Sequence, residues 1–212
     1  MSPAERAAAI LAEVGAVITD SHVVYTSGRH GVAYVNKDAV YPHTARVSEL
    51  CRLLADRARA LRPEVVCGPA LGGIILSQWT AHHLGALAVY AEKLPAGGIG
   101  LRRGYDRLAA TRRVLVVEDV LNTGGSVRET VSAVRDAGGE VVAVAALCNR
   151  GGVTARDLDV PALMALLELS LDSWEAAACP LCRDGVPINT DVGKGREFLA
   201  SRGLPSYPPR RA

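Results

Sequence analysis

The stretch Val114-Leu115-Val116-Val117-Glu118-Asp119-Val120-Leu121-Asn122-Thr123-Gly124-Gly125-Ser126 gives the clearest indication of the fold. Its apolar first half has the length of a buried strand and leads directly into two adjacent carboxylates. A polar turn with two glycines follows, and apolar residues then recur at helical spacing from Ser126 to about Ala137. Ser126 and Glu129 fit a capping box at the start of that helix. The stretch therefore predicts a strand, a tight loop and a helix that together form one unit of a parallel sheet.

Each part of this loop suits a phosphorylated sugar. In open parallel sheets, ligands bind beyond the carboxyl ends of the strands. Free N–H groups at a helix start favour a phosphate, and Gly124 and Gly125 let the backbone come close to it. The hydroxyls of Thr123 and Ser126 can donate to phosphate oxygens, while the carboxylates of Glu118 and Asp119 can accept hydrogen bonds from a pair of sugar hydroxyls. The loop is neither a Walker A sequence nor a dinucleotide fingerprint, so we expect it to bind a ribose 5′-phosphate.

The neighbouring sequence repeats the alternation of strand and helix. Short apolar runs over residues 64–67, 86–92 and 140–147 predict further strands. The stretches 3–14, 43–58 and 73–84 predict helices. Gly68-Pro69-Ala70-Leu71-Gly72-Gly73 forms a second glycine-rich turn between a strand and a helix. This order predicts an α/β fold in which a parallel sheet is flanked by helices, with a smaller peripheral element after Gly151.

Composition restricts the class of protein. The chain has 212 residues, 49% of them hydrophobic, which is enough for one sizeable domain. A net charge of +2 gives no broad nucleic-acid-binding field, and no apolar run approaches a membrane span. The first residues do not form a secretory signal, so we expect a cytoplasmic protein with reduced thiols.

A candidate lid follows the strand that ends near Lys93. The segment Pro95–Gly100 contains three glycines and lacks core-forming residues, which is typical of a mobile loop. Arg102 and Arg103 come next, and with Lys93 they could neutralise a departing anion. An ordinary surface hairpin with solvated arginines explains the same pattern equally well.

With these motifs, the chain resembles the type I phosphoribosyltransferase family. Residues 116–126 are similar to the motif that binds phosphoribosyl pyrophosphate (PRPP) in that family, although Asn122 stands where Thr is commoner. The resemblance implies that the two acids contact the ribose and that Lys93 also serves catalysis. It also implies a wider set of PRPP contacts: Ala70, Leu71, Gly72, Arg102, Arg103, Glu118, Asp119, Asn122, Thr123, Gly124, Gly125 and Ser126.

The N-terminal segment resembles the orotate-specific branch of the family. The residues that carry this resemblance are Tyr25 to His30 and Tyr34 to Lys37. It implies that the base is contacted by Ser27, Gly28, Tyr34 and Lys37, and that Arg150 binds the orotate carboxylate, because a guanidinium can donate two hydrogen bonds to it. The tail through Gly195 is similar to a bacterial branch called the Thermus type.

The resemblance also implies an activity and an organisation. We expect an orotate phosphoribosyltransferase of pyrimidine biosynthesis that uses Mg²⁺, acts as a homodimer, and forms orotidine 5′-phosphate and pyrophosphate. A single domain over 1–212 would have a core at about 43–152 and a hood from about 1–42 and 153–200. A transferase for a purine or another base, and a non-catalytic PRPP sensor, are the alternatives.

The cysteines pose a separate question. Cys179-Pro180-Leu181-Cys182 is a C-x-x-C pair, which could bind Zn²⁺, act as a redox pair or consist of two reduced thiols. Cys148 and His82 are conceivable further ligands, although nothing in the spacing requires them. His30 is the one histidine that we expect near enough to the active site to have a function.

Overall fold

The computed structural model describes residues 1–169 and 172–204. It divides into two compact units, which are described separately. The core unit comprises residues 1–10 and 40–169, and the small unit comprises residues 11–39 and 172–204.

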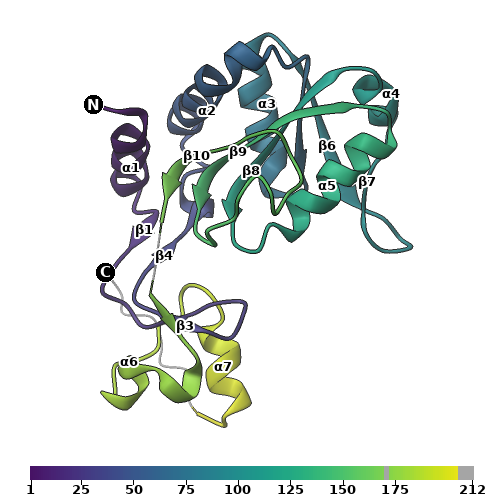
Figure 1. The fold of residues 1–212 in the computed structure, drawn as a ribbon. Helices are drawn as coiled ribbons and strands as arrows, with labels where there is room; N and C mark the ends of the chain where they lie inside the picture. Colours follow the sequence, from purple (N-terminus) through teal and green to yellow (C-terminus); the bar gives the residue numbers. More distant parts are fainter. Residues whose placement is uncertain (170–171, 205–212) are drawn as a thin grey trace. The chain divides into compact units, whose positions relative to one another are not determined.

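A six-stranded sheet forms the centre of the core unit (Figure 1). Every neighbouring pair in it is parallel except the last, where β6 and β7 form an antiparallel hairpin. The apolar runs of β8 and β9 are almost wholly buried, as expected of parallel strands with both faces covered. In spatial order the strands are β10 (Leu163–Glu168), β9 (Glu140–Asn149), β8 (Arg113–Leu121), β5 (Val65–Pro69), β6 (Leu87–Lys93) and β7 (Ile99–Leu101).

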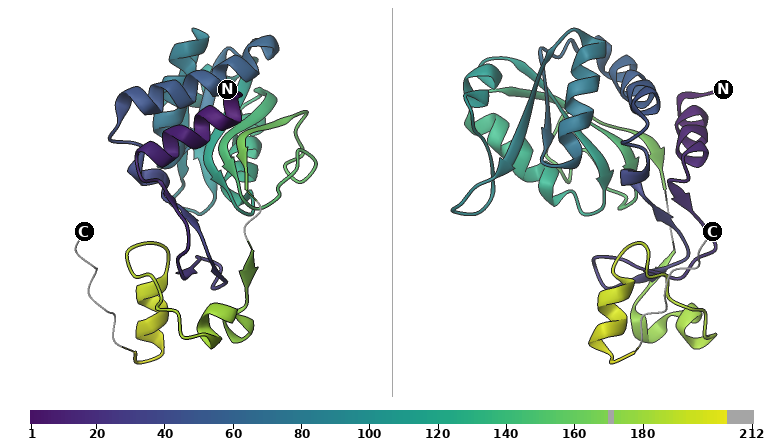
Figure 2. Two further views of the ribbon diagram at one scale, coloured as in Figure 1. Left: turned by 90° about the vertical axis from the view of Figure 1, so that its left-hand side faces the viewer. Right: turned by 180° about the vertical axis from the view of Figure 1, so that it is seen from behind.

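Helices cover both faces of this sheet (Figure 2). The helices α2 (Thr44–Ala58) and α3 (Gly72–Leu84) pack together against one face, whereas α5 (Gly125–Asp136) packs against β8, β9 and β5 from the other. A short 3₁₀ turn, η2 (Arg59–Leu61), continues α2, and α4 (Tyr105–Ala109) precedes β8. The first helix, α1 (Pro3–Glu13), is attached to α2 by a two-pronged ion pair in which Arg6 Nε and Nη2 lie 2.7 and 2.8 Å from the Glu49 carboxylate oxygens.

The small unit is built from short antiparallel pieces. β1 (Val17–Ile18) pairs with β4 (Tyr34–Val35), and a three-stranded sheet has the order β11 (Ser173–Trp174), β3 (His30–Gly31), β2 (Val23–Val24). One 3₁₀ turn, η1 (Lys37–Ala39), follows β4. The chain after β11 supplies η3 (Ala176–Ala178), α6 (Pro180–Arg183) and α7 (Gly195–Ser201).

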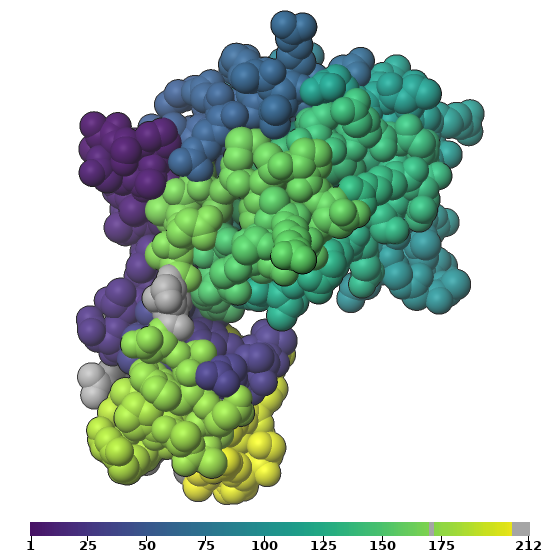
Figure 3. All heavy atoms as spheres, viewed as in Figure 1, coloured from purple at the N-terminus to yellow at the C-terminus, as the bar shows by residue number. Residues whose placement is uncertain are grey.

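The α/β fold and its helix-flanked parallel sheet are confirmed. The predicted helices and strands before residue 150 are all present, with ends within about four residues of those expected. The largest difference is at β8, which continues through the acid pair to Leu121. Between Gly151 and Glu168 the chain differs from the expected peripheral element, because β10 pairs in parallel with β9 and extends the central sheet. The described residues from 172 onward belong to the small unit. In the space-filling view, the loop between these two strands lies at the surface of the core unit (Figure 3). Within the described residues, no helix is both long and apolar enough to span a membrane.

Candidate active site

The two glycine-rich turns lie at the ends of adjacent strands. β5 and β8 are paired in parallel, with Cys67 opposite Val116. The helix that follows β5 covers one face of the sheet and the helix that follows β8 covers the other. The chain therefore leaves these two strands in opposite directions. In open α/β sheets, such a switch point opens a crevice in which ligands bind.

The predicted acid pair stands at the end of β8, and both carboxylates are largely buried. Glu118 and Asp119 are 7% and 5% exposed. Glu118 Oε1 accepts from the Asp119 N–H at 3.0 Å, and its Oε2 accepts from Ser126 Oγ at 2.9 Å. Asp119 Oδ1 accepts from the Val120 N–H at 2.6 Å. These bonds fix the orientation of two carboxylates, and a carboxylate oxygen can accept more than one hydrogen bond.

Tyr41 joins the two turns, a role that no local sequence pattern indicates. Its hydroxyl lies 3.1 Å from both Asp119 Oδ2 and the carbonyl oxygen of Gly72. It therefore connects the acid pair near the end of β8 with the first residue of the helix after β5. A tyrosine just before a predicted helix can have many roles, so only the folded structure identifies Tyr41 as part of the site.

The loop after β8 forms a phosphate-sized hollow. A cavity of about 120 Å³ is lined by the backbone and side chains of Val120 to Ser126, which is room for roughly four water molecules. Gly124 caps α5 with a φ of +72°, a conformation that favours glycine. The N–H groups of the first turn of α5 have no acceptors within the helix, as at any helix start.

The predicted capping box is wrong. The helix begins one residue earlier than expected, Gly124 is its N-cap, and no side chain caps it. Ser126 thus lies inside the first turn, and its hydroxyl donates to Glu118 instead. This bond ties the start of the helix to the acid pair.

Arg150 reaches the phosphate loop from the neighbouring strand. Its Nε donates to Asn122 Oδ1 at 2.9 Å, and its backbone N–H donates to the carbonyl of Leu121 at 2.9 Å. Gly151 also donates to Leu121, at 3.0 Å. A Cβ on Gly151 would lie 1.5 Å from the Asn122 carbonyl oxygen, so only glycine permits this approach.

The loop that carries Arg150 is itself fixed by a buried amide. Asn149 is 4% exposed; its Nδ2 donates to the Val153 carbonyl at 2.8 Å, and its Oδ1 accepts from the Val153 N–H at 3.1 Å. Asn122, which departs from the commoner Thr, therefore has a structural use as the acceptor for Arg150. Sequence reasoning missed both amide contacts. The bond between Asn122 and Arg150 joins residues 28 positions apart, and no local pattern assigns the Asn149 side chain to the turn that it closes on Val153 four residues later.

The second turn, after β5, is compact. A Cβ on Gly68 would lie 2.2 Å from the Gly73 carbonyl oxygen, which explains the need for glycine there. The Ala70–Leu71 peptide bond is cis, and the Ala70 N–H donates to Ala91 O at 2.7 Å. The Leu71 side chain is exposed and α3 begins at Gly72, so its first turn offers N–H groups as the loop after β8 does.

The candidate lid is the β6–β7 hairpin. Lys93 ends β6 opposite Ile99, and a cavity of about 390 Å³ is lined by both, by Leu94, Gly97 and Gly98, and by Ser126 and Glu129 of α5. Lys93 thus lies beside the start of the phosphate-loop helix. Arg102 and Arg103 flank Glu92 instead: Arg103 Nη2 lies 3.2 Å from Glu92 Oε2. Their predicted role in binding pyrophosphate stays a prediction.

The other expected base contacts belong to the small unit. Gly28 has a φ of +81° in a turn closed by its N–H on Tyr25 O, and Ser27 Oγ accepts from the Arg29 N–H at 3.4 Å. Tyr34 lies in β4 and Lys37 begins η1. Their contact with a base stays a prediction.

His30 is not available to a ligand at the turn of Ser27 and Gly28. It is wholly buried and forms a cluster with His22, Cys179 and Cys182. Cys148 and His82 belong to the core unit, on β9 and α3, and are not part of this cluster. Burial raises the pKa of the Cys148 thiol to about 11, as expected of a core residue.

Comparison with known proteins agrees with this geometry. The model of the phosphoribosyl transferase domain matches residues 36–178. An orotate phosphoribosyltransferase of Caldicellulosiruptor bescii is 40% identical over 81% of this chain and 88% of its own length. One from Pelotomaculum thermopropionicum is 42% identical over 84% of this chain and 92% of its own.

A solved structure gives the same result. The orotate phosphoribosyltransferase of Mycobacterium tuberculosis H37Rv in complex with PRPP is 28% identical, with a TM-score of 0.61 over 79% of this chain and 96% of its own. The family match covers more than half of the chain and includes both glycine-rich turns. The chain therefore belongs to the type I phosphoribosyltransferase family, with orotate phosphoribosyltransferases among its relatives.

Proposed function

We propose that this chain transfers the phosphoribosyl group of PRPP to orotate, giving orotidine 5′-phosphate and pyrophosphate for pyrimidine nucleotide synthesis. The observation that carries the proposal is the pair of phosphate-suited turns on adjacent strands, with the buried Glu118 and Asp119 beside one of them. PRPP matches all three features: its 5′-phosphate suits the turn after β8, its two ribose hydroxyls suit the acid pair, and its diphosphate suits the turn after β5.

The chemistry needs positioning and charge stabilisation more than a covalent intermediate. N1 of orotate attacks C1 of the ribose, and pyrophosphate leaves from the opposite side through a transition state with oxocarbenium character, as in glycoside cleavage. The C1–N1 bond forms as the C1–O bond to pyrophosphate breaks, and the N1 proton is released with the pyrophosphate. The loop at 122–126 holds the 5′-phosphate, and the two carboxylates accept from the ribose hydroxyls. Lys93 and the turn at 70–73 face the charge that develops on pyrophosphate.

A magnesium ion fits this arrangement as part of the substrate complex. The local ligand atoms are carboxylate oxygens, which a hard cation prefers, but they come from only two side chains, Glu118 and Asp119, and all four oxygens already accept protein hydrogen bonds. Among the described residues, the one group of three or more potential ligands is the His/Cys cluster of the small unit. We therefore propose that PRPP oxygens supply most of the Mg²⁺ ligands. When bound, the ion neutralises the diphosphate.

The base specificity rests on Arg150. Its guanidinium belongs to a loop clamped onto the phosphate loop, which supports a place near C1 of the ribose. Orotate carries a carboxylate that uracil lacks, and a guanidinium can bind it through two hydrogen bonds. We also retain a homodimer as part of the proposal, because the family resemblance implies one.

The test is a panel of acceptors with PRPP and Mg²⁺: orotate, uracil, adenine and guanine. Of the four bases, we expect only orotate to cause pyrophosphate release. The variant Asp119→Asn should lower kcat/KM for PRPP at least about tenfold, because it loses a charge-assisted hydrogen bond. Asp136→Asn makes the same change at an exposed position of α5 and is the control. Turnover of a purine instead, or of no base, would contradict the assignment.

A further inference from the structure

In the small unit, side chains of the types that bind metals lie where a hydrophobic core would be expected. Its described residues form only short strands and helices, and two of its largest fully buried side chains are histidines, His22 at 1% and His30 at 0% exposure. Cys179, also buried, caps the short helix α6, and Cys182 lies one turn further, toward the surface. Two imidazoles and one thiol thus occupy the interior of a unit with few large apolar residues, and the second thiol lies at its edge.

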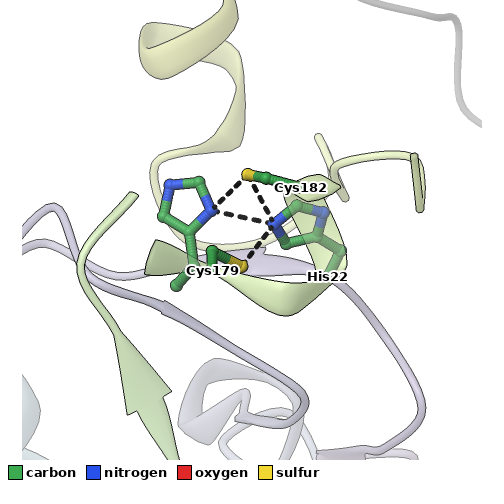
Figure 4. A group of neighbouring side chains, drawn as sticks. His22, Cys179 and Cys182 are labelled. Atoms are coloured by element: carbon green, nitrogen blue, oxygen red, sulfur yellow. Dashed lines mark hydrogen bonds between the residues drawn. The ribbon is translucent and has the colours of Figure 1, made fainter. Parts of the chain in front are cut away.

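The side chains of His22, Cys179 and Cys182 point toward one another (Figure 4), and His30 belongs to the same group. One ligand atom from each of His22, His30, Cys179 and Cys182 lies within 4.8 Å of the other three. Cys182 Sγ is 3.4 Å from His30 Nδ1 and 3.7 Å from His22 Nε2, and Cys179 Sγ is 3.7 Å from the same His22 nitrogen. The two ring nitrogens are 2.8 Å apart.

These separations are close to those of a tetrahedral zinc site. Zn–N and Zn–S bonds of about 2.05 and 2.3 Å place nitrogen and sulfur ligands roughly 3.5 Å apart, and two nitrogens roughly 3.3 Å apart. The nitrogen–sulfur distances of 3.4–3.7 Å agree with this geometry. Among these four separations, the nitrogen–nitrogen distance is the one that is shorter, by about 0.5 Å, which small rotations of the rings would correct.

The surroundings prepare His22 as a ligand. Its Nδ1 lies 2.7 Å from the carbonyl oxygen of Val186, which can only accept a hydrogen bond, so Nδ1 carries the hydrogen and donates. Nε2 then presents its lone pair to the other three residues. A carbonyl that orients a histidine in this way is the usual outer contact of a metal-bound imidazole.

His30 is placed in a similar way by packing. Its ring meets the Phe198 ring edge-on, with centroids 4.7 Å apart. Its Nε2 is buried and has no hydrogen-bond partner among the described residues, so Nδ1 is the ring atom that the fold engages. A bare dithiol pair or a redox pair would explain the C-x-x-C spacing, but neither requires two buried imidazoles facing the sulfurs.

We propose that His22, His30, Cys179 and Cys182 bind one structural Zn²⁺ ion. Two thiolates and two neutral imidazoles balance the charge of the dication, and this mixed sulfur and nitrogen set selects zinc over the hard cation of the reaction. All four positions are protein ligands, so the site is closed and has no catalytic position. This zinc site is independent of the proposed transferase activity.

The ion would join two distant parts of the chain. The sulfur–nitrogen pairs link residues separated by 152 to 160 positions, so the N-terminal strands β2 and β3 are held to α6. Units of this size rarely bury enough apolar surface alone, and a metal supplies the missing cross-link. Removing the ion should therefore loosen the small unit before the core unit.

The first experiment is metal analysis of the full chain purified without chelators from zinc-supplemented cells. We expect about one zinc per chain, and a release of zinc when the thiols are blocked with a mercurial. The double variant Cys179→Ser with Cys182→Ser, and His22→Gln, should each lose at least about nine-tenths of the metal. His82→Gln and Cys148→Ala change the same residue types elsewhere and should retain it.

A second measurement keeps the proposal testable if the variants fold poorly. In the wild-type chain, Co²⁺ exchanged for zinc should give the visible bands of a tetrahedral ion with thiolate charge transfer. A strong chelator should speed tryptic cleavage after Arg183 and Lys194 while a core fragment persists, and added Zn²⁺ should reverse this. Less than about a tenth of a zinc per chain after reconstitution, zinc retained by the double variant, or a Cys179–Cys182 disulfide in anaerobically prepared protein would each overturn the proposal.

Discussion

Replacing Arg150 by Ala is the most direct perturbation of base choice. The substitution removes the guanidinium whose Nε donates to Asn122 Oδ1, but leaves the backbone bond from residue 150 to Leu121 in place. We expect the variant to lose its preference for orotate over uracil while its PRPP affinity changes less than about tenfold. The reason is that the carboxylate is the group by which orotate differs from uracil.

The expected size follows from the surroundings of the side chain. Losing one partner of a fully buried charge pair costs about 2–5 kcal/mol. Arg150 is only partly buried, so the lower end applies, about 2 kcal/mol or a factor of roughly 30 in kcat/KM. Arg150→Lys keeps the charge but lacks the planar guanidinium, so its kcat/KM for orotate should lie between those of the wild type and Arg150→Ala.

The assay measures kcat/KM for orotate and uracil at saturating PRPP, together with the PRPP dissociation constant. Arg156→Ala is the control, because it removes an exposed arginine from the same connecting segment. Asn122→Ala breaks the bond seen in the structure but keeps the guanidinium, so most of the preference should remain. Wild-type orotate kinetics in Arg150→Ala would refute the reasoning and make this residue purely structural.

Three further changes test the rest of the site. Tyr41→Phe removes the hydroxyl shared by Asp119 and Gly72 and should lower kcat/KM for PRPP by about tenfold or more, with little change in melting temperature; equal kinetics would remove Tyr41 from the site. Lys93→Ala should lower kcat about tenfold and leave the KM for the base nearly unchanged, since an exposed cation acts on the leaving pyrophosphate; a fall confined to base affinity would reassign it. Gly151→Ala should lower the free energy of unfolding by about 3 kcal/mol or more in denaturant titrations, because its Cβ meets a carbonyl oxygen; an unchanged midpoint would show that the loop can move away.

The sequence alone determined the central βα units and the position of the phosphate loop. Long apolar runs bounded by glycine turns predict buried parallel strands, because period and turn chemistry are local properties of the chain. For the same reason the residue pattern alone places the acid pair at the end of β8. The short strands of the small unit and the edge strand β10 have no such signal, since pairing with distant segments defines them.

Only the tertiary structure decided which distant side chains meet. Tyr41 with Asp119, Arg150 with Asn122, and His22 with the C-x-x-C pair are contacts across 28 to 160 positions, and residue spacing does not encode them. The predicted capping box was wrong for a related reason. The Ser126 hydroxyl donates to Glu118, a partner that capping rules based on spacing within the helix do not consider. Local patterns fix the backbone of an element, but the partner of a polar side chain depends on which elements the packed sheet brings together.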